Sequence, residues 1–255
     1  MRNVARKISV TLAGVVVAAA LLLQGCGGGG KGTKGEEAFA PEKQFARADK
    51  LLDDKDYEEA RKLLLEVKNR DTTKKYAPMA QLKIADSYIR EKEPDLGIEE
   101  YRRFLELYPD NQYASYAQYQ IAMAYFSQIE AADRGSGAAK KALREFQRLK
   151  ELYPRNPYRE AVELRIEKAQ NIIAEGEFLA GEFYFKKEAY QAAIGRFEGL
   201  LKQFPEYKRA DETLLLLGKS YRAVKMSDKA REAFQALITK YPSSRFVSEA
   251  KKGSL

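Results

Sequence analysis

Four prolines that follow an aromatic residue mark a repeating pattern of small, aromatic and apolar positions along the chain. These steps are Tyr108-Pro109, Tyr153-Pro154, Phe204-Pro205 and Tyr241-Pro242. Twelve residues before each proline lies a small residue (Gly97, Ala142, Ala193, Ala230), eight before it an aromatic one (Tyr101, Phe146, Phe197, Phe234), and five before it an apolar one (Phe104, Leu149, Leu200, Leu237). With 3.6 residues per turn, the three positions share one helical face. Since proline disfavours helical geometry in the residue before it, the pattern predicts a helix that ends at each step.

A second helix is predicted ahead of each of these helices, because small residues recur three positions before an aromatic one. The pairs are Ala85/Tyr88, Ala122/Tyr125, Gly181/Tyr184 and Gly218/Tyr221. A small residue lets two helices approach closely, and the aromatic residue fills the seam between them. Leu217-Gly218-x-x-Tyr221 is close to the first-helix signature of the tetratricopeptide repeat. A degenerate first copy keeps Ala60, Leu64 and Val67, with Thr72 in place of proline.

The pattern therefore predicts an all-α fold, an α-solenoid of about five tetratricopeptide-like helix-turn-helix repeats over residues 38–255. The repeats are expected at about 38–72, 73–109, 110–154, 155–205 and 206–242, followed by a final helix at 243–252. The 45-residue spacing between Pro109 and Pro154 predicts a loop around Asp133–Gly137. The 51-residue spacing between Pro154 and Pro205 predicts a longer helix through Val162–Ala180.

The first 37 residues have the pattern of an export signal and a tether. Arg2, Arg6 and Lys7 precede an apolar run from Ile8 to Leu23, which is short for a bilayer-spanning helix. The run ends in Leu23-Gln24-Gly25-Cys26, which resembles a bacterial lipobox, although Gln24 is unusual at its position. We expect a signal peptide at 1–25, a lipid-acylated Cys26 and a flexible glycine-rich tether at 26–37. The alternative is an ordinary signal peptide with a chance cysteine. Under the lipoprotein sorting rule, Gly27 rather than Asp after the cysteine implies the outer membrane.

Composition narrows the function classes. The chain has no His, no Trp and one Cys, which excludes histidine-based metal sites, Ser-His and Cys-His nucleophile systems, and an internal disulfide. The net charge of +8 falls to +5 once the three positive residues before Cys26 are removed, and the rest is spread among acids. This is not the basic stripe that nucleic-acid binding needs. The acidic pairs Glu99/Glu100 and Glu175/Glu177 do not face each other on a helix. We therefore expect no enzyme, no metal site and no cofactor beyond the lipid on Cys26.

The signal, lipobox, tether and five long repeats together resemble the BamD family of outer-membrane β-barrel assembly lipoproteins. The likeness covers roughly residues 38–250 and is strongest in the fourth repeat, across Gly181–Tyr190 and Ala192–Leu201. It implies a non-catalytic scaffold, lipid-anchored on the periplasmic face of the outer membrane. Its C-terminal repeats would hold the periplasmic domains of the barrel protein BamA, and its N-terminal repeats would receive unfolded outer-membrane β-barrel substrates. Other assembly-machinery lipoproteins are further possible partners.

The resemblance also implies which residues meet these partners. Arg196 aligns with a family arginine that pairs with an acid on BamA, the alternative being an ordinary surface arginine. Glu182, Tyr184 and Lys187 are weaker candidates for the same interface. Arg103 matches a family arginine near the substrate-facing end, and its alternative is a solvated side chain.

The chain departs from the family pattern at three places. Gly195 replaces the family's Asn, Gly135-Ser136-Gly137 replaces an Asp-Pro step, and Asn69–Thr72 replaces an aromatic-Pro turn. The last departure leaves substrate capture at the first repeat an open question. Two other classes remain: a pilotin-like or division-coordinating tetratricopeptide lipoprotein, and an enzyme with a helical-repeat appendage. The 51-residue spacing is against a pilotin, whose repeats are more uniform.

Overall fold

The computed structural model describes residues 39–129 and 136–254, which are all-α and contain no strand. The helices of these residues are α1 (Pro41–Asp53), α2 (Tyr57–Arg70), α3 (Ala77–Arg90), α4 (Pro94–Leu107), α5 (Ala114–Ser127), α6 (Gly137–Leu152), α7 (Arg159–Lys186), α8 (Tyr190–Gln203), α9 (Ala210–Ala223), α10 (Ser227–Lys240) and α11 (Val247–Gly253). They belong to one unit of the chain, Ala40–Leu255. The signal peptide, Cys26, the whole of the tether and Asp133–Gly135 of the expected loop lie outside the described residues. Gly137, expected in that loop, instead begins α6.

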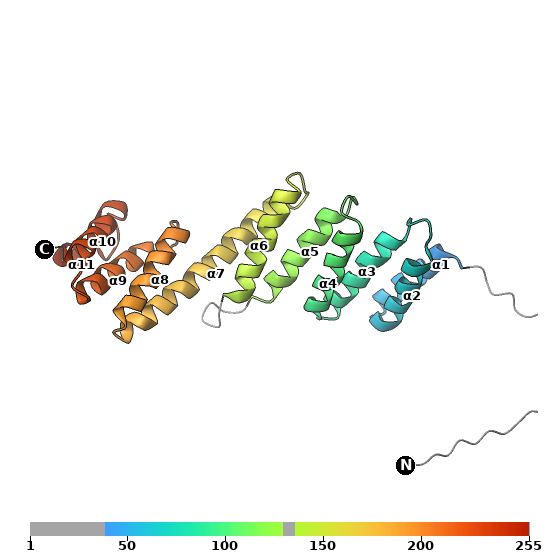
Figure 1. Ribbon diagram of the computed structural model, residues 1–255, viewed down its shortest axis with the longest axis horizontal. Coiled ribbons are helices and arrows are strands. Elements are labelled where there is room, and N and C mark those ends of the chain that lie inside the picture. The colour runs from blue at the N-terminus through green and yellow to red at the C-terminus, as the bar shows by residue number, and fades with distance from the viewer. Residues whose placement is uncertain (1–38, 130–135, 255) are drawn as a thin grey trace, which may run out of the picture. The chain divides into compact units, whose positions relative to one another are not determined.

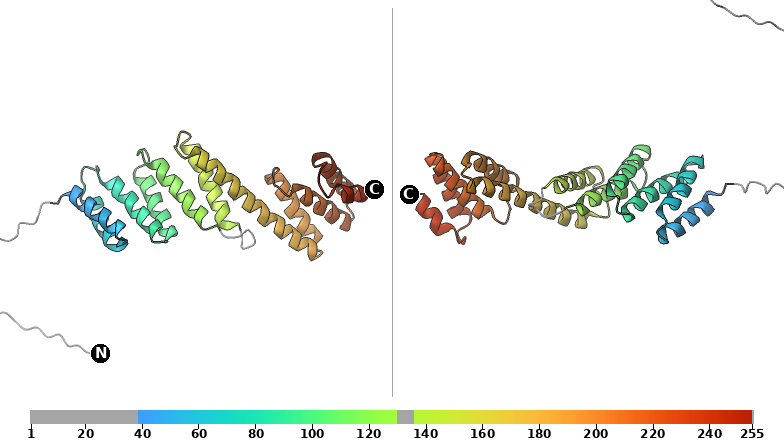
Figure 2. Two further views of the ribbon diagram at one scale, coloured as in Figure 1. Left: turned by 180° about the vertical axis from the view of Figure 1, so that it is seen from behind. Right: turned by 90° about the horizontal axis from the view of Figure 1, so that it is seen from below.

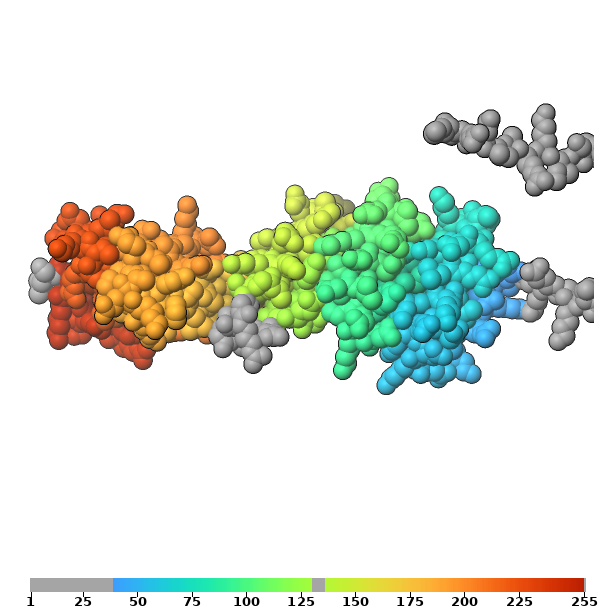
Figure 3. All heavy atoms as spheres, turned by 60° about the horizontal axis from the view of Figure 1, so that its bottom comes forward, coloured from blue at the N-terminus to red at the C-terminus, as the bar shows by residue number. Residues whose placement is uncertain are grey.

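Each helix packs against the helices before and after it in the sequence, as the ribbon views show (Figures 1 and 2). Odd- and even-numbered helices form five successive helix-turn-helix pairs, and α11 packs against α10 and α9. The space-filling view shows neighbouring segments of the unit beside one another in the order of their residue numbers (Figure 3). Such nearest-neighbour packing is what defines a solenoid of repeats. The prediction of about five tetratricopeptide-like repeats is confirmed.

The aromatic-Pro steps end the second helices of the last four repeats. Tyr108, Tyr153, Phe204 and Tyr241 are the C-cap residues of α4, α6, α8 and α10. Tyr108 leaves helical geometry with φ −137° and ψ 55°, while its N–H still donates to the carbonyl oxygen of Phe104 at 2.8 Å. The following proline enforces this exit, since its ring clashes with a preceding helical residue.

The repeated aromatic and apolar positions form the core. Tyr101, Phe146, Phe197 and Phe234 are 0–1% exposed, and so are Phe104, Leu149, Leu200 and Leu237. In the degenerate first copy, Ala60, Leu64 and Val67 are 0% exposed. The small residues have the expected role of close approach, because Gly181 lies against the Phe197 ring and Gly218 against the Phe234 ring.

Helix α7 explains the longest repeat. It is one continuous helix of 28 residues, twice the length of α8, α9 or α10. Its buried residues continue from Val162 near its start to Gly181 near its end. The extra residues therefore lengthen the first helix of the fourth repeat at its N-terminal side, as the 51-residue spacing predicts.

The turn between α2 and α3 is organised by an aspartate instead of an aromatic-Pro step. One carboxylate oxygen of Asp71 accepts from the backbone N–H and the hydroxyl of Thr73, at 3.1 and 2.6 Å. The other accepts from the backbone N–H groups of Tyr76 and Ala77. Asp71 is only 8% exposed. The departure at Asn69–Thr72 therefore exchanges a proline turn for one held by side-chain hydrogen bonds, which satisfy N–H groups at the start of α3.

Candidate partner-binding site

The four residues expected at the BamA-like interface lie in the fourth repeat, on the end of α7, the turn after it, and α8. Glu182 pairs with Lys186 one turn later on α7, with 3.0 Å between its Oε2 and the lysine Nζ. Lys187 is the exposed C-cap of α7. Tyr184 is half-buried on the last turn of the same helix. The structure thus places all four in one repeat, with Arg196 contributed by α8.

Arg196 is joined to an acidic residue of its own chain. Its Nη1 lies 2.8 Å from Oε2 of Glu177, and its side chain is 46% exposed. Oε1 of Glu177 lies 3.1 Å from Nζ of Lys140 on α6. Glu177, whose side chain is 20% exposed, therefore bridges a cation of the third repeat to a cation of the fourth. The three side chains carry a net charge of +1, since two cations share one carboxylate.

Electrostatics keep this cluster ionised. Burial alone would raise the pKa of Glu177, but hydrogen bonds from Arg196 and Lys140 outweigh it and lower the pKa. The hydrogen bond to Glu177 raises the pKa of Arg196, with a smaller contribution from Tyr184. The guanidinium is therefore a fixed positive charge beside the Tyr184 ring.

The sequence pattern does not point to two members of this site. Glu177 stands in the sequence beside another acid, Glu175, and its partner Arg196 is 19 residues away. Phe183 is 56% exposed, and its ring contacts that of Tyr184 edge-on with centroids 5.6 Å apart. Its signal in the sequence is an aromatic residue off the buried face of α7. Exposed aromatic and arginine side chains together are typical of binding hot spots.

The Glu177–Arg196 pair occupies a position that recurs in four repeats. The first residue of the pair lies four residues before the small residue of a repeat's first helix, and the second lies one residue before the aromatic residue of its second helix. In repeats two to five the pairs are Gln81–Glu100, Gln118–Glu145, Glu177–Arg196 and Leu214–Ala233. The glutamines donate to the glutamates in the first two pairs, and both residues of the last pair are buried. The fourth repeat alone among these places an arginine at this junction, with its charge directed partly to solvent.

Arg103 lies apart from this site, on α4 of the second repeat. Its Nη1 is 3.1 Å from Oε1 of Glu100 on the same helix, and its side chain is 55% exposed. Glu100 also accepts a hydrogen bond from Gln81. The structure does not bring Arg103 together with Arg196.

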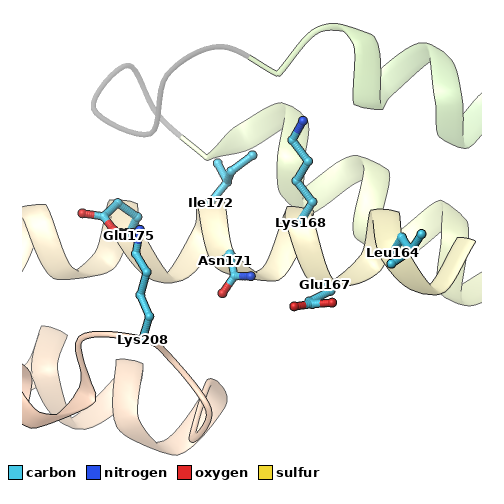
Figure 4. Close-up of a pocket in the computed structure, with 7 residues that line it drawn as sticks. All are labelled: Leu164, Glu167, Lys168, Asn171, Ile172, Glu175 and Lys208. Carbon is cyan, nitrogen blue, oxygen red and sulfur yellow. Dashed lines mark ion pairs between the residues drawn. The ribbon is translucent and has the colours of Figure 1, made fainter. Parts of the chain in front are cut away.

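Hollows on the surface carry no arrangement that suggests catalysis among the described residues. A hollow of about 470 Å³ lies along the middle of α7, between Leu164 and Glu175 (Figure 4). Lys208, from the segment before α9, reaches Glu175 there with 3.5 Å between Nζ and Oε2. Glu175 also pairs with Arg209 at 2.8 Å. The described part of the chain has no group of three or more His, Cys, Asp or Glu residues placed to hold a metal ion. Among its helices, none has the length and hydropathy to cross a membrane.

Comparison with known proteins identifies the family. A family model described as "outer membrane lipoprotein", YfiO, matches residues 37–234. The chain belongs to this family. A relative from Caulobacter vibrioides, named outer membrane protein assembly factor BamD, is 27% identical over 243 residues, which cover 95% of this chain and 79% of the relative. Relatives with the same name from Neisseria gonorrhoeae and Rickettsia prowazekii are 24% and 26% identical, and the matches cover 92% and 78% of this chain and 93% and 80% of theirs. The BamD resemblance in the sequence is thus confirmed.

Two solved structures that the chain resembles in part have tetratricopeptide repeats in their names. The TPR2AB domain of yeast Sti1, solved in a complex with pHSP90, is 14% identical with a TM-score of 0.47, over 84% of this chain and 81% of that one. A thermophilic repeat protein from Thermus thermophilus is 15% identical with a TM-score of 0.35, over 84% of this chain and 98% of that one.

Proposed function

We propose that this chain is a non-catalytic scaffold of the outer-membrane β-barrel assembly machinery, anchored by a lipid on Cys26 at the periplasmic face. Its fourth repeat binds the periplasmic domains of a BamA-like barrel protein, and its N-terminal repeats receive unfolded barrel substrates near Arg103. Other lipoproteins of the machinery are further partners. Membership of the outer membrane lipoprotein family and the printed name of the relatives, assembly factor BamD, support this role.

The single observation that supports the BamA-like contact best is the half-exposed Arg196 in a cluster of net charge +1. Only its Nη1 is bonded to Glu177, and a guanidinium has five N–H donors in a planar fork. The remaining donors suit a carboxylate on a partner, which would also neutralise the excess charge of the cluster. Glu177 holds the guanidinium in place beforehand, so that less side-chain entropy is lost when a partner binds.

The aromatic side chains beside Arg196 extend the same contact surface. Tyr184 interacts with Arg196, and its ring contacts the exposed ring of Phe183. Aromatic residues and arginine are enriched in protein interfaces relative to the rest of the surface. We therefore expect Phe183 to contact the partner together with Arg196, while Glu182 and Lys187 lie at the rim.

Site-specific photo-crosslinking in cells tests this proposal. A photoreactive amino acid at position 183 leaves Arg196 and Glu177 intact, and the same probe at Leu107 of the second repeat, which is likewise 56% exposed, serves as the matched control. We expect position 183, and not 107, to give an adduct with a large β-barrel that carries repeated periplasmic domains. An adduct with a secretin or a division protein would instead assign the chain to the pilotin-like or division-coordinating class.

A charge exchange tests the role of Arg196 itself. Arg196→Glu should weaken the complex by tenfold or more, on the order of 1.4 kcal/mol or above, because it places like charges opposite each other. Reversal of the partner's acid to Lys should restore binding. The control Lys62→Glu changes the net charge equally on α2 of the first repeat, where Lys62 pairs with Glu58 and Glu59. A lipid on Cys26 is checked separately by mass spectrometry of the mature N-terminal peptide.

A further inference from the structure

The cluster around Arg196 includes one side chain from outside the fourth repeat. Lys140 lies on α6 in the third repeat, and its Nζ is 3.1 Å from Oε1 of Glu177 on α7. Nη1 of Arg196, on α8, lies 2.8 Å from the other carboxylate oxygen, Oε2. Each oxygen of Glu177 is therefore bonded to a different cation, and the contact with Lys140 joins two repeats.

Lys140 occupies a position where the other second helices carry acidic residues or glutamine. The position lies two residues before the small residue of the second helix, and in repeats one to five it holds Glu58, Asp95, Lys140, Gln191 and Asp228. Acidic side chains are favoured there, because the first turn of a helix carries a partial positive charge. The first turn of α6 has no acidic residue. Lys140 therefore departs from the local preference, and the carboxylate that compensates it comes from the next repeat. Departures of this kind are expected at functional sites.

The contact with Lys140 limits how Glu177 pairs with Arg196. Arginine–carboxylate pairs are frequently bidentate, with two parallel hydrogen bonds. Here the hydrogen bond from Arg196 to Glu177 is made by Nη1 to a single oxygen. Lys140 donates to the second oxygen, so Glu177 cannot turn both oxygens toward the guanidinium without losing that bond. The arginine donor that a bidentate pair would use stays available to a partner.

Lys140 also sets the charge of the cluster. Without it, Arg196 and Glu177 alone would have a net charge of zero instead of +1, and the attraction for a partner's carboxylate would be weaker. The Lys140 side chain is 55% exposed and that of Glu177 is 20% exposed. Because solvent screens a pair of this exposure, its effect on binding should be moderate.

We propose that Lys140 is a positioning residue for the contact made by Arg196: it holds one oxygen of Glu177 and thereby keeps the guanidinium free to pair with a carboxylate of the partner. Lys140 acts through Glu177 and not by a direct bond to the partner's acid. This inference rests on the proposed function, and it extends the site from the fourth repeat into the third.

The test is the affinity of the full-length chain for the purified periplasmic domains of the barrel protein captured by the crosslink at position 183. Lys140→Met keeps the length of the side chain but removes its charge and its donors, and it should weaken binding by about three- to tenfold, the scale of one hydrogen bond. Lys140→Arg retains both and should bind within about twofold of the wild-type chain. The matched control is Lys141→Met at the next position of α6, where Nζ lies 5.3 Å from the centre of the Tyr125 ring and the residue is also exposed. It changes the net charge equally and should stay within about twofold, since separated exposed charges are screened.

A second substitution separates positioning from a loss of structure. Glu177→Gln in the Lys140→Met background removes the charge that competes for Arg196, while the amide oxygen can still accept one hydrogen bond. The double variant should therefore bind more tightly than Lys140→Met alone. A merely structural role of Lys140 would make it bind equally or more weakly, and that result would overturn the proposal. An unchanged affinity of Lys140→Met, or equal losses in Lys140→Met and Lys141→Met, would do the same.

Nuclear magnetic resonance of the Arg196 side chain tests the same step without a partner. In Lys140→Met, a bidentate pair with Glu177 should slow the rotation of the guanidinium and separate Nη signals that are averaged in the wild-type chain. Unchanged signals would overturn the proposal. If position 183 captures no barrel protein in the wild-type chain, the scaffold role fails, whereas these signals still decide how Glu177 pairs. Far-UV circular dichroism of each variant shows whether the helices are intact.

Discussion

The seam between α7 and α8 offers a sharp test of how the repeats are packed. Gly181 of α7 faces the ring of Phe197, and a Cβ added at this position would lie 2.4 Å from Cε1 and 2.7 Å from Cδ1. The ring has little room to retreat, because Phe197 is 0% exposed and packs against Phe178 with centroids 6.1 Å apart. Gly181→Ala must therefore push the two helices apart or force the ring off its rotamer.

Two opposing effects set the magnitude. Overpacking of a tight core costs about 1–3 kcal/mol. Replacing Gly by Ala inside a helix stabilises it by roughly 1 kcal/mol. We expect Gly181→Ala to lower the free energy of unfolding by up to about 2 kcal/mol after both effects. Gly195 on α8 is the matched control, because an added Cβ there meets nothing within 4 Å. Gly195→Ala should stabilise the chain by roughly 0.5–1 kcal/mol.

Urea unfolding followed by far-UV circular dichroism measures the difference. The urea midpoint should fall for Gly181→Ala and rise for Gly195→Ala, with an unchanged slope in both. Gly218→Ala should behave like Gly181→Ala, since its Cβ would lie 2.5 Å from Cε1 of Phe234. Gly97→Ala should lower the free energy of unfolding by less, because the added Cβ would lie 2.6 Å from Cδ1 of Ile89, the movable end of that side chain. A midpoint for Gly181→Ala equal to or above that of Gly195→Ala would refute the close approach of the two helices.

Two further predictions concern charged side chains that hold segments together. Asp71→Ala should destabilise the first two repeats by about 1–3 kcal/mol, because N–H groups at the start of α3 lose their hydrogen-bond acceptor. Hydrogen exchange of the α2 and α3 amides measures this loss. Burial raises the pKa of Asp71, but its hydrogen bonds outweigh this effect and leave the pKa below 3.8. The stabilisation by Asp71 is therefore present above about pH 4 and is lost as the pH falls through the folded-state pKa. Hydrogen-exchange protection of this turn that does not change below pH 4 would contradict this role of Asp71. Arg209 lies 3.7 Å over the centre of the Phe178 ring and also pairs with Glu175 and Glu212. Because a lysine cannot make all of these contacts, Arg209→Lys should lower the free energy of unfolding, measured in urea, by about 1–2 kcal/mol. An unchanged midpoint would show that the guanidinium contributes nothing there.

The order of helices could be predicted from the sequence because it depends on local patterns. The offsets from each aromatic-Pro step identify residues on one face of a helix, and the same residues are fully buried in the structure. The 51-residue spacing likewise predicted a lengthened α7, since a continuous apolar face can be followed from Val162 onward. Helix periodicity, turn chemistry and small residues at close approaches are all properties of neighbouring residues.

Which charged side chains meet depends on how the helices pack. The resemblance implies a partner's acid for Arg196, with an ordinary surface arginine as the alternative; in the structure it pairs with Glu177, 19 residues earlier, which in turn reaches Lys140, 37 residues before Glu177. The hollow along α7 also depends on how far each helix is rotated about its axis. Such rotations are set by the packing of whole faces, so ion-pair partners on different helices cannot be read from residue type and spacing. Local patterns along the chain therefore specify the repeats and their core, and the packing of whole helix faces sets the charged surfaces that those repeats present.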